Sequence, residues 1–234
     1  MSDAFFHDKD AFDAIASLNL VNETDHNMNG EDLVFQVYST ILNRYFQFNK
    51  YAVQKVEQML SRFRNRYLVG FHIRMGDAES DFKEGVHFLY KSDIARFVNC
   101  CYIDRSQDPV FYVASDSSAA KAIIKMHAKN TVFQNATAVH SRGEIRRRHG
   151  TSGLQGVLVD VLVLSKCHVI IGTKGSSLTY LAAAFQGHYP YYVTRNTDCY
   201  CPQHLTTLLS SLKEADGPAR CSNPCYNATI SRIT

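Results

Sequence analysis

Residues 67–73, YLVGFHI, form a short apolar run that stops at the more polar stretch Arg74-Met75-Gly76-Asp77. A short apolar run bounded in this way predicts a buried strand. The same pattern returns three times, at 109–114 (PVFYVA), 168–171 (HVII) and 191–193 (YYV). Stretches with the apolar spacing of helices separate these runs. Strands that alternate with helices predict an α/β fold, a Rossmann-like parallel sheet with helices on both faces.

The residues before this first strand predict helices and no strand. Apolar side chains follow helical spacing from Glu31 to Tyr45 and again from Tyr51 to Arg66, after a polar lead-in at 1–30. Further helices are expected at 89–104, 117–129, 153–167, 176–187 and 202–214. We therefore expect three parts: a mainly helical N-terminal segment at 1–66, a Rossmann-like domain at 67–215, and a cysteine-containing tail at 216–234.

The composition is that of an ordinary globular protein. Of the 234 residues, 45% are hydrophobic and 20% are charged, which excludes collagen, coiled coil and disorder as descriptions of the whole chain. The formal net charge of +3 is too small to indicate nucleic acid binding. No apolar run reaches the roughly 18 residues of a transmembrane helix, and the N-terminus shows no signal peptide.

Cysteines and glycosylation sequons favour the lumen of the ER or Golgi. The sequons begin at Asn22, Asn135 and Asn227, and four of the seven cysteines lie in the last 36 residues. No CxxC pair is present, so a zinc site is not expected. We expect a glycoprotein of the secretory pathway, held at a membrane only through an N-terminal anchor outside this sequence.

The cysteine pairing is left open by the sequence. Cys221 and Cys225 are expected to close a small loop, or to pair with Cys199 or Cys201. Cys167 lies in an apolar helix and is expected to be a buried, inert thiol.

Each predicted strand ends in side chains that can hold a polar ligand. Ligands of open α/β sheets bind beyond the carboxyl ends of the strands. An arginine fork and the free N–H groups of a helix N-terminus both suit phosphate, although Ser176 is also a plausible N-cap. Neither a Walker A motif nor GxGxxG follows a strand, which disfavours a P-loop NTPase and a dehydrogenase. The four strand ends carry His72, Arg74 and Asp77; Ser115 and Asp116; Thr173 and Ser176; Thr194 and Arg195.

Asp160 is a carboxylate within an otherwise apolar helix, GVLVDVLVL (156–164). A buried carboxylate is costly unless it is paired. One interpretation is a structural pair with a nearby arginine or histidine. The other is a contact with a ligand that has two adjacent N–H donors, such as the N1 and N2 edge of guanine.

Three segments resemble, in order and spacing, the motifs of the fucosyltransferases that use GDP-fucose. VGFHIRMGD (69–77) is similar to their His-x-Arg-x-x-Asp motif, FYVASD (111–116) to their second motif, and residues 156–185 to their third. The family includes core α1,6 enzymes, bacterial nodulation enzymes, plant α1,2 enzymes and protein O-fucosyltransferases. Its fold, GT-B, has two Rossmann-like halves, and the resemblance covers the donor-binding half. It implies that the acceptor half is missing or reduced here.

The resemblance also implies a role for each matching residue. Arg74 would hold the β-phosphate, while His72 and Asp160 would contact guanine. Ser176 and its helix N-terminus would complete the phosphate site, and Asp116 would lie near the nucleotide. The donor site would consist of His72, Arg74, Asp116, Asp160, Thr173, Ser176 and Ser177.

The catalytic residues of the family are matched less fully. In the α1,6 enzymes a lysine directly follows the motif aspartate, but here Ala78 follows Asp77. A glutamate base comes a few residues later in those enzymes. Glu84 fits that place only with a two-residue insertion, and Glu79 and Asp81 compete with it. The catalytic candidates are Arg74, Asp77 and Glu84.

The leading prediction is an inverting glycosyltransferase that moves fucose from GDP-fucose to a hydroxyl of a glycan or protein. Arg74 and the helix dipole at Ser176 would stabilise the leaving GDP in place of a metal. The Asp-x-Asp triplet at 8–10 lies in the polar lead-in, so neither a metal nor another cofactor is expected. The alternative is a non-catalytic module that binds a guanine nucleotide or glycan and kept the donor fold; the missing lysine favours it.

Overall fold

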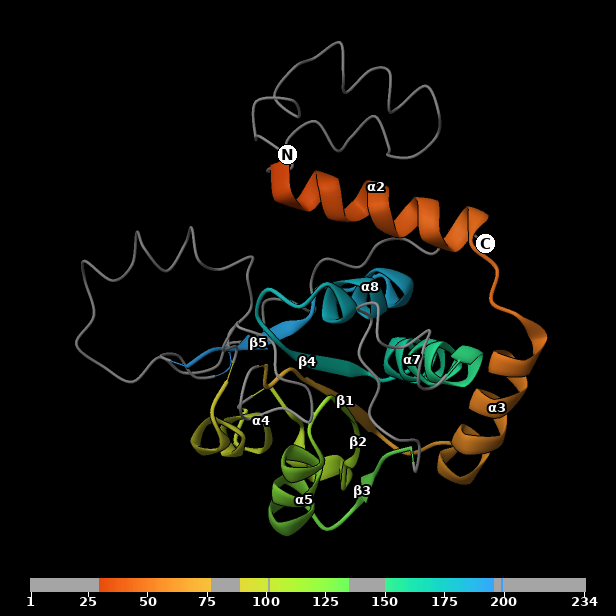
Figure 1. The fold of residues 1–234 in the computed structure, drawn as a ribbon. Coiled ribbons are helices and arrows are strands. Elements are labelled where there is room, and N and C mark those ends of the chain that lie inside the picture. Colours follow the sequence, from red (N-terminus) through yellow and green to blue (C-terminus); the bar gives the residue numbers. More distant parts are fainter. Residues whose placement is uncertain (1–29, 77–88, 101, 135–149, 196–198, 200–234) are drawn as a thin grey trace.

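The computed structural model describes residues 30–76, 89–100, 102–134, 150–195 and 199. The described part is built on a five-stranded sheet in the order β3-β2-β1-β4-β5, with every strand pair parallel (Figure 1). The predicted α/β fold is thereby confirmed. The strands are β1 (Leu68–Ile73), β2 (Val110–Ser115), β3 (Thr131–Val132), β4 (Val169–Thr173) and β5 (Tyr191–Val193).

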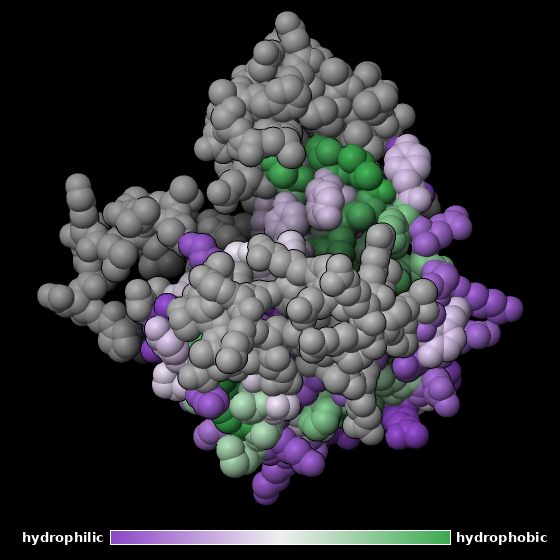
Figure 2. Space-filling model, viewed as in Figure 1, coloured by the Kyte–Doolittle hydropathy of each residue, from purple (hydrophilic) through white to green (hydrophobic). Residues whose placement is uncertain are grey.

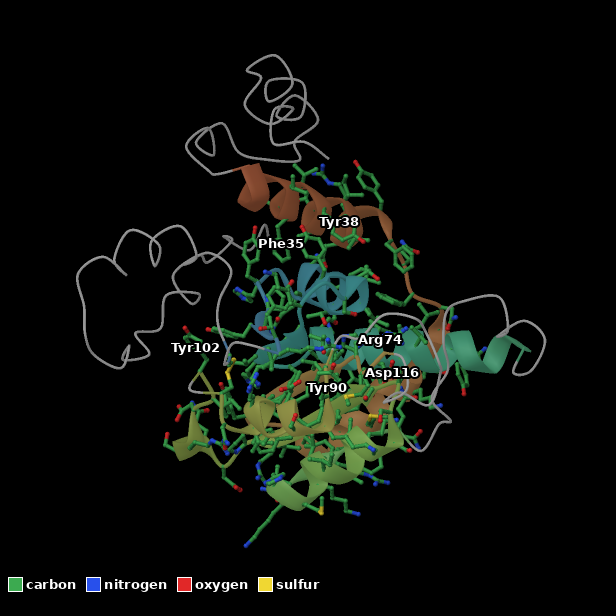
Figure 3. All side chains as sticks on the ribbon, turned by 60° about the vertical axis from the view of Figure 1, so that its left-hand side comes forward. Phe35, Tyr38, Arg74, Tyr90, Tyr102 and Asp116 are labelled. Atoms are coloured by element: carbon green, nitrogen blue, oxygen red, sulfur yellow. A yellow bond between two sulfur atoms is a disulfide. The ribbon has the colours of Figure 1, made fainter. Side chains whose placement is uncertain are left out.

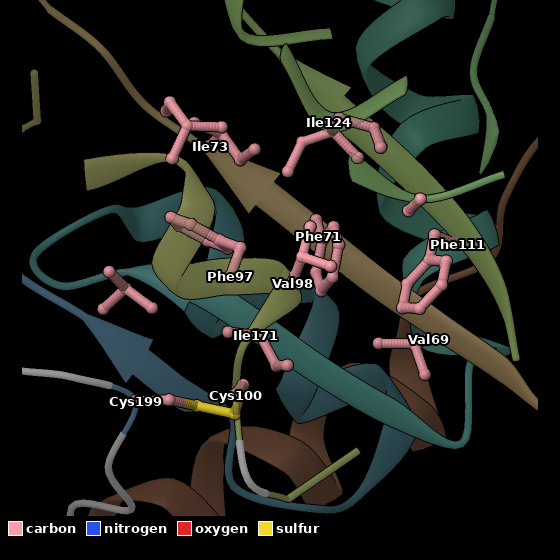
Figure 4. Packing of buried hydrophobic residues seen from close by; sticks show 14 of the residues in the cluster. Val69, Phe71, Ile73, Phe97, Val98, Cys100, Phe111, Ile124, Ile171 and Cys199 are labelled. Carbon is pink, nitrogen blue, oxygen red and sulfur yellow. A yellow bond between two sulfur atoms is a disulfide. The ribbon is translucent and has the colours of Figure 1, made fainter. Parts of the chain in front are cut away.

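The strands formed where the apolar runs predicted them, except for β3, which the sequence did not predict. This edge strand has two half-buried residues, so it leaves no apolar run to recognise. β1 is central and wholly buried. Its side chains alternate between the two faces of the sheet. Val69, Phe71 and Ile73 enter one core (Figure 4), whereas Leu68 enters the core on the other face.

Helices cover both faces of the sheet, as expected. α4 (Ala95–Val98) and α5 (Ser118–His127) pack on one face, on the side of Phe71. α7 (Gly150–Ser165) and α8 (Ser177–Gln186) cover the other. Ser117 begins α5, because its side chain accepts from the amide of Ala120.

The described N-terminal helices extend the layer of α7 and α8. They are α2 (Gly30–Tyr45), close to its predicted bounds, and α3 (Lys50–Leu60). α3 begins where it was predicted but ends six residues before Arg66, and a 3-10 turn (Ser61–Phe63) follows it. Phe35 of α2 is buried and stacks on Tyr189 with ring centroids 4.1 Å apart. Ser39 donates a 2.6 Å hydrogen bond to the carbonyl of Ala184. α2 is thus attached to α8 by both apolar and polar contacts, while the division of the chain at residue 66 stays a prediction.

The outer side of α2 is apolar in part. Ile41 of α2 and Phe46, the residue after this helix, are exposed, and Figure 2 shows apolar surface in the region of α2. None of the described helices is long and apolar enough to cross a membrane.

The single helix expected at 89–104 is wrong. The segment instead contains a 3-10 turn (Lys91–Asp93) and the four-residue α4, and another 3-10 turn (Arg105–Gln107) begins directly after the segment. Asp93 accepts from the amide of Tyr90 at 2.9 Å, and Asp104 accepts from the amide of Ser106 at 3.0 Å. Such local side-chain bonds to the backbone compete with a continuous helix. The helix expected at 202–214 lies outside the described residues.

One disulfide is present in the described part. It joins Cys100, after α4, to Cys199, after β5 (Figure 4). Of the alternatives for Cys221 and Cys225, a bond to Cys199 is therefore wrong, since proximity in the fold and not in the sequence decides the partner. Cys167 is a free, buried thiol, as predicted, and its burial raises its pKa.

Candidate functional site

The carboxyl ends of β1, β2 and β4 bring four of the predicted site residues to one edge of the sheet. In the register, Ile73 of β1 pairs with Ser115 of β2, and His72 pairs with Gly172 of β4. The residues that the structure gathers just before and after these positions are His72, Arg74, Asp116 and Thr173.

Arg74 and Asp116 form an ion pair across the ends of β1 and β2. Arg74 Nη1 lies 2.8 Å from Asp116 Oδ2, and the exposed fractions of the two side chains are 16% and 4%. Asp116 Oδ1 also accepts from the amide of Met75 at 3.0 Å. Burial raises the pKa of Asp116, against the opposite effects of the Met75 amide and the Arg74 charge. Asp116 therefore positions both the guanidinium of Arg74 and the backbone turn after β1 (Figure 3).

Thr173 fixes the backbone of Arg74 from the other side. Its Oγ1 accepts from the Arg74 amide at 2.9 Å and donates to the His72 carbonyl at 3.3 Å. Both hydrogen-bonding functions of this buried hydroxyl are thus engaged with β1. A contact between Thr173 and a ligand stays a prediction.

His72 is held by Thr179, a residue that the sequence did not single out. His72 Nδ1 lies 2.6 Å from Thr179 Oγ1 on α8, and both side chains are buried. Burial, with a smaller contribution from the charge of Arg74, lowers the pKa of His72 to about 3, so the imidazole is neutral near pH 7.

Gly172 makes room for this contact. A Cβ atom at position 172 would lie 2.1 Å from Thr179 Cγ2, far inside van der Waals contact. A glycine before the polar end of a strand was the available signal for a close neighbour, although it does not name Thr179.

Ser176 and Ser177 begin α8 at the carboxyl end of β4. Ser176 is the N-cap residue, but its side chain makes no capping hydrogen bond. Ser176 thus occupies the N-cap position, as the sequence indicated, but its hydroxyl does not cap the helix. Gly175, with φ of 81°, makes the preceding turn, and Ser177 is exposed. The first turn of α8 therefore lies next to the strand ends that carry Arg74 and Thr173.

Asp160 is paired, but with neither an arginine nor a histidine. Its Oδ1 accepts from the Tyr112 hydroxyl of β2 and from Gln134 Nε2, the latter at 2.5 Å. Its Oδ2 accepts no hydrogen bond from any residue in the described part of the chain. Burial raises the pKa of Asp160, an effect that the two hydrogen bonds oppose. Asp160 therefore has a structural pairing, and its partners, Tyr112 and Gln134, are polar side chains that were not predicted from the sequence.

Several predicted residues lie outside the described part of the chain. They are Asp77, Glu79, Asp81, Glu84, the three sequon asparagines, the Asp-x-Asp triplet at 8–10, and Cys201, Cys221 and Cys225. Among the described residues, no three histidine, cysteine or acidic side chains come together as a metal site would require. Independence from metal stays a prediction.

Matches to known proteins were found among solved structures. No family model and no curated protein matches the sequence. Similar solved structures include fucosyltransferases: NodZ from Bradyrhizobium (11% identity, 75% of this chain and 52% of that chain, TM-score 0.48), an Arabidopsis thaliana FUT1 mutant in complex with GDP (10%, 74% and 42%, 0.49), and NodZ α-1,6-fucosyltransferase co-crystallized with GDP (11%, 71% and 49%, 0.47).

The chain spans about half the length of these three structures.

Proposed function

We propose that the carboxyl edge of the sheet binds GDP-fucose, and that the protein transfers fucose to a hydroxyl acceptor. The observation that carries the proposal is the place of Arg74. The chain runs outward from β1 through β2 to β3 and then returns to β4 on the other side of β1. This reversal is the topological switch point at which open α/β sheets bind ligands. Arg74 leaves β1 at that point, opposite the first turn of α8.

The surroundings of Arg74 suit a diphosphate. Asp116 and Thr173 hold its side chain and backbone, so the guanidinium is preorganised. The N-terminus of α8, with Ser176 and Ser177, adds the partial positive charge of a helix start. Because His72 is neutral, it can recognise a polar group of the ligand without adding charge.

Guanine recognition is assigned to the region around Asp160. Oδ1 is occupied by Tyr112 and Gln134, whereas Oδ2 is available to accept from a ligand N–H. Gln134 Oε1 is buried without a hydrogen-bond partner, and its Nε2 contacts Asp160. Two acceptors with unused capacity therefore lie close together, as the two donors of the guanine edge require.

In the proposed reaction, the acceptor oxygen attacks C1 of fucose and the bond from C1 to the β-phosphate oxygen breaks. GDP leaves with the electron pair, and the hydroxyl proton passes to a base, for which Asp77 and Glu84 are the candidates. Charge grows on the β-phosphate oxygen as the bond breaks. Arg74 and the α8 N-terminus would stabilise this charge without a metal. The Cys100–Cys199 disulfide supports an oxidising compartment such as the ER or Golgi lumen.

A non-catalytic guanine-nucleotide module is the second candidate, favoured by Ala78 at the place of the family's lysine. Incubation with GDP-fucose, with water as the minimal acceptor, tests both. We expect release of fucose and GDP above the rate of a protein-free control. Binding of GDP-fucose without release would support the module. Absence of both binding and release would contradict the proposed donor site.

A further inference from the structure

Arg195 lies two residues after β5, and the residues that the structure describes give its guanidinium group no counter-charge. Its centre lies 4.2 Å from the centroid of the Tyr90 ring, a cation–π contact. Nε and Nη2 are buried and have no hydrogen-bond partner. Within the described part of the chain, no carboxylate pairs with Arg195. A buried donor of positive charge left unpaired is costly, so this arrangement calls for a ligand.

The backbone that carries Arg195 is firmly held. Arg96 Nη1 donates to the carbonyl of Thr194 at 2.9 Å and to that of Arg195 at 2.5 Å. Four residues further on, Cys199 is bonded to Cys100. The ring of Tyr90, labelled in Figure 3, fixes the plane of the guanidinium. The fork formed by Nε and Nη2 is therefore preorganised, which is the property that bidentate binding of an oxyanion needs.

Arg195 belongs to the same edge of the sheet as Arg74. β4 lies between β1 and β5, and Val193 pairs with Thr173 at the strand ends. With strands about 4.8 Å apart, the ends of β1 and β5 lie about 10 Å from each other. Two long arginine side chains that leave these ends can approach one diphosphate from either side. Arg74 already pairs with Asp116, whereas no carboxylate in the described ranges pairs with Arg195.

We propose that Arg195 is a second phosphate-binding residue, whose Nε and Nη2 donate to two oxygens of the diphosphate of the nucleotide sugar. This inference rests on the proposed function for the identity of the ligand. The physical requirement is only an oxyanion with two oxygens that match the fork.

Calorimetric titrations with GDP, GMP and inorganic pyrophosphate test the inference. In Arg195→Gln and Arg195→Lys, we expect affinity for GDP and pyrophosphate to fall at least tenfold, and affinity for GMP to fall less. Arg195→Lys keeps the charge and the ring contact, so its loss would report the fork. Arg105→Gln is the matched control, because Arg105 also lies over an aromatic ring, that of Phe111, but before the amino end of β2.

The outcomes separate the inference from the proposed function. GDP binding that is unchanged in both Arg195 variants would overturn the inference and leave the function standing. Pyrophosphate binding that depends on Arg195, without GDP binding by the wild type, would keep the phosphate site and overturn the function. A wild type that binds neither ligand would overturn both. A thermal melt of each variant shows whether the fold is intact, and Arg195→Lys serves if Arg195→Gln unfolds.

Discussion

Arg74 Nη1 lies 2.8 Å from Asp116 Oδ2, and this ion pair joins the carboxyl ends of β1 and β2. In the sequence, each residue is a candidate ligand group at a strand end. In the fold their roles differ, since the more deeply buried Asp116 orients Arg74 and also accepts from the Met75 amide. The pair makes Arg74 a preorganised cation at the switch point of the sheet.

Arg74→Lys is expected to weaken GDP binding at least tenfold while the melting temperature stays close to that of the wild type. Lysine keeps a positive charge beside Asp116 but loses the planar fork that binds two phosphate oxygens. Calorimetry and a thermal melt of the same sample measure both effects. Arg66→Lys, in an exposed pair with Asp108, is the control and should change neither. An affinity for GDP within threefold of the wild type would remove Arg74 from the phosphate site.

Asp160→Asn and Tyr112→Phe separate guanine recognition from structural pairing. Asp160→Asn replaces a carboxylate oxygen with a donor, so we expect GDP affinity to fall roughly ten- to a hundredfold, or about 1–3 kcal/mol. Tyr112→Phe removes one hydrogen bond to Oδ1 but leaves Oδ2 in place, so stability should fall and GDP affinity should change little. If Asp160→Asn lowers stability and leaves GDP affinity unchanged, Asp160 is structural only.

His72 predicts a loss of stability on the acid side of neutrality. Its pKa is about 3 in the folded protein, against an ordinary value of 6.5. The folded state therefore favours the neutral imidazole, whereas the unfolded chain takes up a proton below about pH 6.5. The contribution is complete above about pH 6.5 and is lost as the pH falls toward 3, at up to about 1.4 kcal/mol per pH unit. Urea unfolding at pH 5, 6 and 7 measures the slope. His72→Gln should make the slope shallower, and an unchanged slope would contradict the buried, neutral state.

The Cys100–Cys199 disulfide should stabilise the fold, because it closes a loop with a sequence separation of 99. The double variant Cys100→Ala/Cys199→Ala is expected to lose about 2–5 kcal/mol of unfolding free energy. A reductant should therefore lower the melting temperature of the wild type more than that of the double variant. Equal shifts in the two proteins would show that this bond contributes nothing.

The sequence predicted those parts of the structure that leave a local pattern. The apolar runs located β1, β2, β4 and β5, and the polar strand ends located Arg74. β3 was not predicted because it has only two residues. The helix expected at 89–104 is interrupted near its start, where the Asp93 side chain accepts from the Tyr90 amide.

Side-chain partners distant in sequence could not be predicted. Thr179 lies 107 residues from His72, and Tyr112 lies 48 residues from Asp160. No spacing rule connects such pairs, since only the stacking of α7 and α8 on the sheet brings them together. The candidate ligand-binding residues were thus predicted from motifs, while the residues that position them required the fold.

Calorimetric titration of the wild-type protein with GDP, ADP and UDP tests the central claim most directly. All three carry the same diphosphate, so they differ at the base and isolate recognition of guanine. We predict saturable binding of one GDP per chain, with ADP and UDP bound at least tenfold more weakly. Absence of GDP binding, or equal affinity for all three nucleotides, would contradict a donor site for GDP-fucose.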